Sequence, residues 1–388
     1  MTMSEQTPVP AGFRGLAGNI GIKDPHDDFF VVASEVPAHV SAVFTRSRFA
    51  GPSVVLSRSA AADGNVRGVV TLARNANVAT GAEGEAHARE VQELAAAAAG
   101  VPADEMIVAS TGVIGRPYPM DKIRSTFDGL SSPLPAADLD RSAAAMMTTD
   151  TRPKTASARV GEATVTGIAK GVGMIEPDMA TMLAWFFTDA EIDRSTLDAV
   201  FRRVVDRTFN ALSIDSDTST SDSAAVLANG LAGPVGTEAF EEALYGVALQ
   251  LVRMIASDGE GAGKLIEVRM SGARDDAQAK RVAKAVVNSP LVKTAVHGAD
   301  PNWGRVAMAV GKCSDETDIH RENVRIFFGD VETYPAPSDE ETLRRASEHL
   351  SGDEVLIGVD LGIADGSFTV YGCDLTEDYI RINADYTT

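Results

Sequence analysis

A single threonine, Thr181, lies in an apolar run directly after the glycine-rich stretch KGVGMIEPDMA, which covers residues 170–180. Threonine is common in β-strands, so a buried strand is one interpretation of this hydroxyl. A threonine hydroxyl becomes a strong nucleophile only beside a base, and no histidine is close to it in the sequence. If the chain were cut between Ala180 and Thr181, the freed α-amino group, with a pKa of about 7.7–8.0, would supply that base. The residues alone favour the buried strand.

Several glycine- and hydroxyl-bearing corners are further candidates for chemistry. In ASTGVIG (109–115), Thr111 and Gly112 follow the apolar run EMIV. A glycine directly after a strand lets a backbone N–H approach a ligand closely, and a neighbouring hydroxyl adds a second donor. RNANVATG (74–81) places Asn75 and Asn77 two residues apart, which predicts that they share one side of a strand. MTTDTRPK (147–154) and HGADPNWGR (297–305) are similar polar corners, and each alone is more often a turn than a site.

Other motifs fail on spacing. SDGEGAGKLIE (257–267) has only three residues between Gly259 and Gly263 and lacks a hydroxyl after Lys264, so it is not a P-loop. The carboxylates of SIDSDTSTSDS (213–223) lack the glycine that a calcium loop needs, and a hydrogen-bonded turn is favoured there. The six histidines form no zinc-binding pair, and no GxSxG elbow occurs. We therefore predict no metal site.

The composition excludes some partners. The 388 residues carry a net charge of −20, which argues against nucleic acid and anionic membranes as partners. The N-terminus does not resemble a signal peptide, and no apolar stretch approaches the ~18 residues of a membrane span. The two cysteines, Cys313 and Cys373, are too few for a disulfide framework. A soluble, cytoplasmic protein is expected.

The elements that must position these residues are predicted from hydrophobic periodicity. The first half is expected to be mainly short strands with one clear helix over 83–100, ending at Gly100. The second half is expected to alternate longer helices with strands, with capping boxes at Ser195 and Ser338. The predicted strands cover 28–36, 39–46, 52–59, 66–78, 105–111, 264–272, 323–328, 354–363 and 367–375. This mixture predicts an α/β (α+β) fold of layered sheets flanked by helices.

The motifs together resemble one family. KGVGMIEPDMATML is similar to the cleavage-site signature of the ornithine acetyltransferases, also called glutamate N-acetyltransferases. The stretches RNANVATG, ASTGVIG, MTTDTRPK, FNALSIDSDTSTSD, SDGEGAGKLIEV, VVNSPLVKTAVHGADPNWGR and YIRINADYTT also match, in order and over nearly the whole chain. SAVFTRSRFAGPSVVL and NSPLVKTAVHG resemble in particular the members that act in clavulanic acid biosynthesis.

This resemblance implies an N-terminal-nucleophile fold and a chain that cuts itself. The bond would be Ala180–Thr181, giving an alpha chain of residues 1–180 and a beta chain of residues 181–388 that starts with the nucleophile Thr181. Thr111 and Gly112 take the places of the family's oxyanion hole. The family's substrate contacts fall on Thr148, Lys170, Thr181, Glu260, Asn383 and Thr388, with Thr149 or Thr151 as alternatives to Thr148.

The implied reaction moves the acetyl group of N2-acetylornithine to glutamate through an acetyl-threonine, in ping-pong order and without metal or cofactor. Glu260 would meet the ornithine ammonium and Lys170 a carboxylate. The alternative is a related amidase or aminopeptidase that passes the acyl group to water. Use of acetyl-CoA as a second donor, and a role in arginine synthesis or in a specialised pathway, stay open. The family suggests a heterotetramer of two alpha and two beta chains.

Overall fold

The computed structural model describes residues 6–22, 25–130, 132–176, 182–336 and 339–385. Of the predicted site residues, Ala180, Thr181 and Thr388 lie outside these ranges. The chain forms two compact units. The first comprises the described parts of 1–174, 178–210 and 217–251, and the second those of 175–177, 211–216 and 252–388. This division differs from the predicted cut after residue 180, which stays a prediction.

The first sheet of the first unit brings two strand ends together. Its strands, in spatial order, are β1 (Phe13–Gly18), β2 (Phe29–Ser34), β4 (Gly68–Leu72) and β5 (Met106–Ser110). β4 and β5 are parallel, and Leu72 pairs with Ser110 at their carboxyl ends. The turns that follow these strands therefore lie side by side, with an isolated bridge between Asn75 and Val113.

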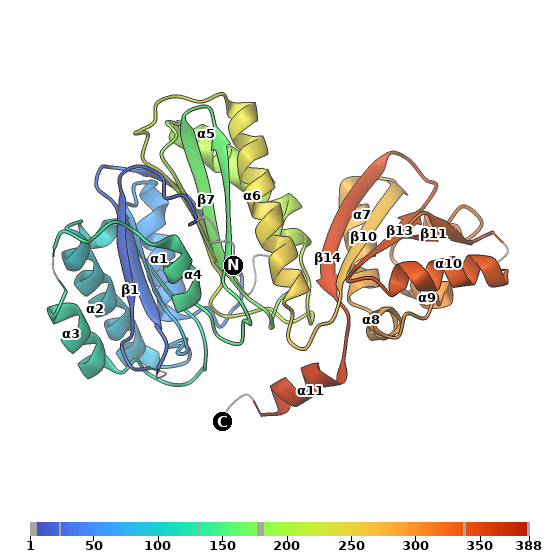
Figure 1. Ribbon diagram of the computed structural model, residues 1–388, viewed down its shortest axis with the longest axis horizontal. Helices are drawn as coiled ribbons and strands as arrows, with labels where there is room; N and C mark the ends of the chain where they lie inside the picture. The colour runs from blue at the N-terminus through green and yellow to red at the C-terminus, as the bar shows by residue number, and fades with distance from the viewer. Residues whose placement is uncertain (1–5, 23–24, 131, 177–181, 337–338, 386–388) are drawn as a thin grey trace. The chain divides into compact units, whose positions relative to one another are not determined.

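Helices cover one face of this sheet, as Figure 1 shows for α2 (Gly81–Ala99) and α3 (Met120–Asp128). Its other face contributes to a second core that also contains α4 (Leu139–Ala145) and residues of the second sheet. α1 (Pro52–Ala60) packs along β5. The apolar residues of β2 and β4 point alternately into these two cores, which is why both strands are buried along their whole length.

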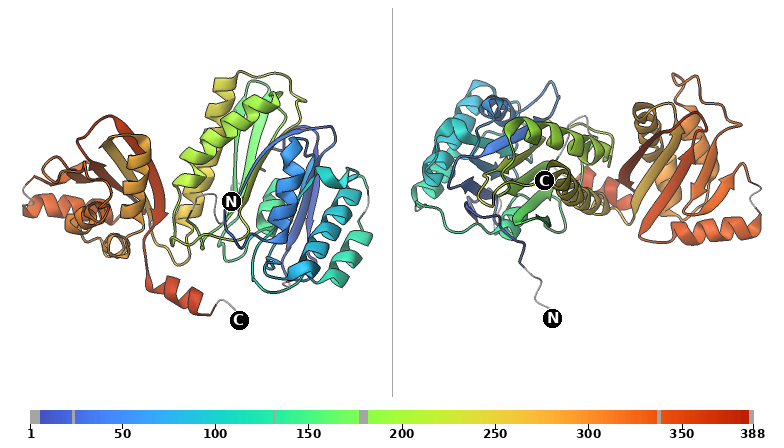
Figure 2. Two further views of the ribbon diagram at one scale, coloured as in Figure 1. Left: turned by 180° about the vertical axis from the view of Figure 1, so that it is seen from behind. Right: turned by 90° about the horizontal axis from the view of Figure 1, so that it is seen from above.

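The second sheet carries the strand that follows the predicted cut. Its spatial order is β3 (His39–Phe44), β9 (Ser223–Ala228), β8 (Leu183–Thr188), β7 (Ala163–Lys170) and β6 (Lys154–Val160). Every residue of β7, β8 and β9 is buried. α5 (Arg194–Arg207) packs on it through ring contacts between Phe186 and Phe201, and α6 (Thr237–Ser257) through Leu251 beside Gly167. The first unit is thus a pair of sheets between helices, seen from two further sides in Figure 2.

The second unit is one sheet with helices. Its strands are ordered β12 (Val331–Tyr334), β11 (Arg325–Phe328), β13 (Glu354–Asp360), β10 (Leu265–Ala273) and β14 (Gly366–Cys373). Its helices are α7 (Asp276–Val287), α8 (Pro290–His297), α9 (Trp303–Gly311), α10 (Glu340–Leu350) and α11 (Glu377–Ala384). Short 3-10 helices at Ala61–Asp63, Ala103–Glu105 and Phe209–Ala211 complete the described elements. The core lies between the sheet and α7, α8, α9 and α10.

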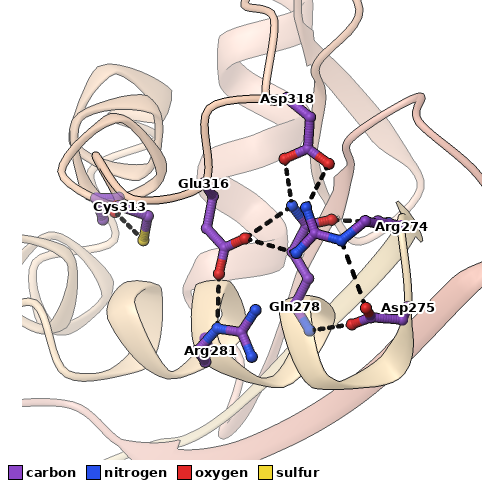
Figure 3. Close-up of polar contacts among 8 residues, drawn as sticks. Arg274, Asp275, Gln278, Arg281, Cys313, Glu316 and Asp318 are labelled. Atoms are coloured by element: carbon purple, nitrogen blue, oxygen red, sulfur yellow. Dashed lines mark hydrogen bonds and ion pairs between the residues drawn. The ribbon is translucent and has the colours of Figure 1, made fainter.

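A polar cluster links the end of β10 and α7 to the loop after α9 (Figure 3). Arg274 forms ion pairs with Asp318 at 2.6 Å and with Glu316 at 3.1 Å, and Arg281 reaches Glu316 at 2.6 Å. Both arginines are about half exposed, so solvent screening leaves each pair only a small contribution to stability. These ion pairs therefore connect the three segments at the surface of the second unit.

The sequence predictions for residues 52–59 and for the cap of α5 were wrong. Residues 52–59 form the helix α1 and not a strand, because Pro52 occupies the first turn after Gly51 and the buried positions Ser53, Val54 and Ser57 follow a helical period. α5 is capped by Asp193, whose carboxylate accepts the Thr196 N–H, and not by Ser195. Ser338 lies outside the described residues, and Asp339 caps α10. None of the described helices has the length and apolar character required to cross a membrane.

Candidate functional site

The corner after β5 is built around Gly112. Its φ is +130°, and a Cβ added there would lie 2.2 Å from the carbonyl carbon of Arg74. Only glycine therefore fits between β5 and the turn after β4. Thr111, directly before it, is 8% exposed, and its N–H donates to the Leu72 carbonyl at 3.1 Å. The predicted oxyanion residues thus occupy a rigid strand-end corner.

Asn75 and Asn77 hold this corner together from the turn after β4. They do not share a face of a strand, because β4 ends at Leu72 and Asn77 has a φ of +51°. The Asn75 side chain donates to the Pro117 carbonyl at 2.9 Å, and its carbonyl oxygen accepts the Asn77 N–H at 2.8 Å. Both amides are used in fixing the turn, which is the structural interpretation of RNANVATG.

Lys170 orients the Thr111 hydroxyl through a hydrogen bond. It is the last residue of β7, is 4% exposed, and donates from Nζ to Thr111 Oγ1 at 3.3 Å. An ammonium group can only donate, so the hydroxyl accepts from Lys170 and its own proton remains available to another acceptor. The arrangement suits a developing negative charge, because the donor hydroxyl is polarised by a buried positive charge.

Asp150 is a carboxylate that the sequence analysis did not single out. It accepts hydrogen bonds from Lys154 Nζ at 2.7 Å, from the Gly171 N–H at 2.8 Å and from the Thr148 N–H at 3.1 Å. Burial raises the pKa of Asp150, but the fields of Lys170 and Lys154 and these hydrogen bonds outweigh it and lower the pKa to about 2. Asp150 is therefore ionised and stabilises both buried ammonium groups.

The same contacts place Thr148. Its N–H donates to Asp150, and its carbonyl accepts a hydrogen bond from the Arg74 guanidinium. Arg74 also forms the wall against which Gly112 packs. Thr148, Lys170, Thr111 and Gly112 are thereby joined by contacts within the first unit. The sequence signal for Asp150 was present in MTTDTRPK, where a carboxylate stands among the threonines.

Glu260 and Asn383 meet in the second unit. Glu260 is 9% exposed, and its Oε2 accepts a hydrogen bond from Asn383 Nδ2 at 2.8 Å. The loop that carries Glu260 is fixed to the start of α11, where the Thr376 hydroxyl donates to the Gly261 carbonyl at 2.6 Å. Gly261 has a φ of +70°, and a Cβ there would lie 2.5 Å from the Tyr379 nitrogen. Lys170 and Glu260 are thus both buried, and their interpretation as surface charges fails.

The carboxylates of the 213–223 stretch do not form one cluster. Asp215 accepts the Ile175 N–H at 2.7 Å, whereas Asp222 is 3% exposed in the first unit. Within the described residues, no group of three metal-ligating side chains is placed to share an ion.

A model of the ArgJ family matches residues 15–388. The chain belongs to the ArgJ family. Glutamate N-acetyltransferase Oat2 of Streptomyces clavuligerus is 65% identical over all of both chains, and the arginine biosynthesis bifunctional protein ArgJ 2 of a Nostoc species is 55% identical over 98% of each. A crystal structure of the Bacillus halodurans bifunctional protein argJ is 41% identical and covers 51% of this chain and 96% of its own, with a TM-score of 0.48.

Membership of the ArgJ family confirms the resemblance to the ornithine acetyltransferases. The predicted α/β architecture of layered sheets flanked by helices is also confirmed. The roles of the individual site residues in this ArgJ-family chain remain predictions. The geometry brings four of them together in the first unit and two in the second.

Proposed function

We propose that the protein is a glutamate N-acetyltransferase that moves the acetyl group of N2-acetylornithine to glutamate. The observation that carries this proposal is the Thr111 hydroxyl, which accepts from the buried Lys170 ammonium beside a position that only glycine can fill. Such a corner offers a hydroxyl and a backbone N–H to one oxyanion. The similarity over the whole chain to the glutamate N-acetyltransferase of Streptomyces clavuligerus supports the same acyl transfer.

In the proposed mechanism the Ala180–Thr181 bond is cut first, and Thr181 becomes the N-terminus of a second chain. Its hydroxyl attacks the acetyl carbonyl while its α-amino group takes the proton. Thr111 and the Gly112 N–H bind the oxyanion, and in comparable sites one such donor contributes about 3 kcal/mol to transition-state stabilisation. The α-ammonium group then gives this proton to the leaving nitrogen as the C–N bond breaks, and ornithine departs from the acetyl-threonine. The amino group of glutamate takes the acetyl group from the threonine by the reverse steps.

The remaining site residues would recognise the substrate. A carboxylate such as Glu260 suits the ornithine side-chain ammonium, and a buried ammonium such as Lys170 suits a substrate carboxylate. Asn383 would hold Glu260 for that contact, since its amide already donates to the carboxylate. Thr148 and Thr388 complete the proposed contacts.

The resemblance also suggests the setting of this reaction. We extend the proposal to an assembly of two alpha chains (1–180) and two beta chains (181–388), acting in the cytoplasm. The closer likeness of SAVFTRSRFAGPSVVL and NSPLVKTAVHG favours a specialised pathway of the clavulanic acid type.

Intact-mass spectrometry of the wild type beside Thr181→Ala tests the nucleophile. We expect two wild-type polypeptides, one ending at residue 180 and one beginning at residue 181, and an uncut, inactive variant. An active wild-type protein of a single full-length mass would overturn the mechanism. An assay with N-acetylornithine then compares N-acetylglutamate with free acetate: transfer in excess supports the acetyltransferase, and hydrolysis in excess supports an amidase.

A further inference from the structure

Two buried strands of the first unit start side by side next to the predicted cleavage point. β8 and β9 are parallel, and Leu183 pairs with Ser223 while Leu183 also pairs with Lys170 on β7. The Ser223 N–H donates to the Met182 carbonyl at 3.1 Å. Asp222 and Met182 therefore precede neighbouring strands, and Met182 is joined by one peptide bond to residue 181.

The carboxyl group of Asp222 is buried in an unusual way. The residue is 3% exposed, and within the described part of the chain neither carboxyl oxygen has a hydrogen bond of ordinary length and angle. Burial raises the pKa of Asp222 well above its usual value. The charge of Lys170, the Met182 N–H and the Thr45 hydroxyl act in the opposite direction without cancelling that effect.

Another buried carboxylate of the same unit shows what a structural role requires. Asp189 directly follows the other end of β8 and is 5% exposed. Its two oxygens accept the Ala11 N–H at 2.9 Å and the Thr164 N–H at 2.7 Å. Native structures rarely leave a buried polar group without such partners, and exceptions concentrate at sites with a chemical role.

The proposed mechanism does not yet name the group that transfers protons while the chain is cut. Before the chain is cut, Thr181 has no α-amino group, so the base used in acetyl transfer does not yet exist. Cutting still requires that the hydroxyl lose a proton and that the departing backbone nitrogen gain one. A carboxyl group with two available oxygens is suited to both tasks, since a protonated oxygen donates while the other accepts.

We propose that Asp222 is the proton relay of this self-cleavage, an inference that rests on the proposed function. The Thr181 oxygen attacks the Ala180 carbonyl carbon and its proton passes to one oxygen of Asp222. The other oxygen of Asp222 gives its proton to the nitrogen of residue 181 as the C–N bond breaks. An ester and an α-amino group result, and Asp222 ends with one proton, as it began. Water then adds to the ester carbonyl, the C–O bond breaks, and the threonine hydroxyl and the Ala180 carboxyl group are released.

The test follows cutting in protein made by brief cell-free synthesis, sampled over time by intact mass. Asp222→Asn cannot relay a proton, and its cutting rate is expected to fall by roughly 10²–10⁴-fold, the usual contribution of general acid–base catalysis. Asp222→Glu keeps the carboxyl group and is expected to restore measurable cutting. Asp189→Asn is the matched control and is expected to be cut at the wild-type rate. Thermal melting of each variant checks that it is folded.

The wild-type rate is also measured across pH. Because the relay starts from the protonated carboxyl group, cutting is expected to slow as pH rises through the raised pKa of Asp222, which faces Lys170. Asp222→Asn cut at the wild-type rate overturns the proposal, as does failure of a folded Asp222→Glu to be cut. If Asp222→Asn does not fold, a wild-type rate independent of pH overturns it instead. If the wild type and Asp222→Asn are cut at the same rate, only the relay is overturned. If the wild type is cut but does not transfer acetyl groups from N-acetylornithine to glutamate, the proposed function itself is overturned.

Discussion

The substitution Gly112→Ala tests whether the corner after β5 is an oxyanion hole. A Cβ at this position would lie 2.2 Å from the Arg74 carbonyl carbon and 2.5 Å from its oxygen, whereas ordinary contact begins at 3.4 Å. The obstacle is backbone, so no side-chain rotation relieves it. The φ of +130° adds strain for any L-residue with a side chain. The Gly112 N–H must therefore move relative to Thr111.

The displacement sets the expected size of the effect. Relief of the overlap requires the two backbones to separate by about 1 Å, and a misplacement of that size can cost about 10²-fold in rate. Loss of one oxyanion-hole donor costs about 10²–10³-fold in kcat. We therefore expect Gly112→Ala to lower kcat by roughly 10²–10³-fold. kcat/KM should fall by the same factor, because the oxyanion interaction is made in the transition state.

Gly115→Ala in the same loop is the matched control. Its φ is also positive, at +83°, but an added Cβ would have nothing within 4 Å. It therefore carries the backbone strain, of about 1–2 kcal/mol, without the collision. Acetyl transfer from N-acetylornithine to glutamate is measured per cut chain, with unfolding in urea as a measure of stability. Equal kcat values for the two variants would refute the assignment of Gly112 to the oxyanion hole.

Three further predictions concern carboxylates at or near the candidate site. Glu260→Gln is expected to raise KM for N-acetylornithine more than KM for an acetylated amino acid with a neutral side chain, and equal effects in a kinetic comparison would exclude the ammonium contact. Asp150, whose pKa is lowered to about 2, contributes stability that is present above its unfolded pKa of about 4 and is lost as pH falls towards 2. Between about pH 6 and pH 2, the free energy of unfolding measured in urea should accordingly fall by roughly 2 kcal/mol more for the wild type than for Asp150→Asn. An equal fall for both proteins would contradict this. Glu176 lies four residues before the predicted cleavage point and forms an ion pair with Lys284 at 3.1 Å. We expect this ion pair to position the chain that leads to the cleaved bond. Glu176→Gln should therefore slow cutting by roughly 10-fold, a small effect for the misplacement of a reacting group. Intact mass would show this, with Glu267→Gln, which breaks another ion pair of the second unit, remaining at the wild-type rate.

Elements with strong local signals were predictable from the sequence. The helix α2 ends at Ala99, and Gly100 adopts the left-handed conformation that its position after an apolar helical run predicts. The strand prediction for 52–59 failed because the pair of valines favours a strand by propensity, whereas the helix is decided by Pro52 and by packing on β5. Propensity over eight residues is a weak signal beside tertiary contact, and the core partner of α1 is some fifty residues away in the chain.

Some residues of the candidate site could likewise be predicted from local sequence, and others could not. Thr111 and Gly112 were found from a local rule, a glycine directly after a strand. Arg74 and Asp150 were missed because their partners come from distant segments: Arg74 packs on Gly112, and Asp150 binds Gly171. A sequence gives the type of such a side chain but not the fold that brings it to a partner.

Under the proposed function, the buried charges near Thr111 favour the formation of a negatively charged oxyanion. Asp150 carries one negative charge and is shared by the ammonium groups of Lys154 and Lys170. Asp222, although it lies in the field of Lys170, has a raised pKa and so favours its neutral form. With Asp222 in that neutral form, these four described groups sum to one positive charge, and Lys170 brings positive charge to the Thr111 hydroxyl, where the oxyanion would form. An ionised Asp222 would cancel that charge, so one raised pKa serves both the proposed cutting of the chain and the acetyl transfer that follows it.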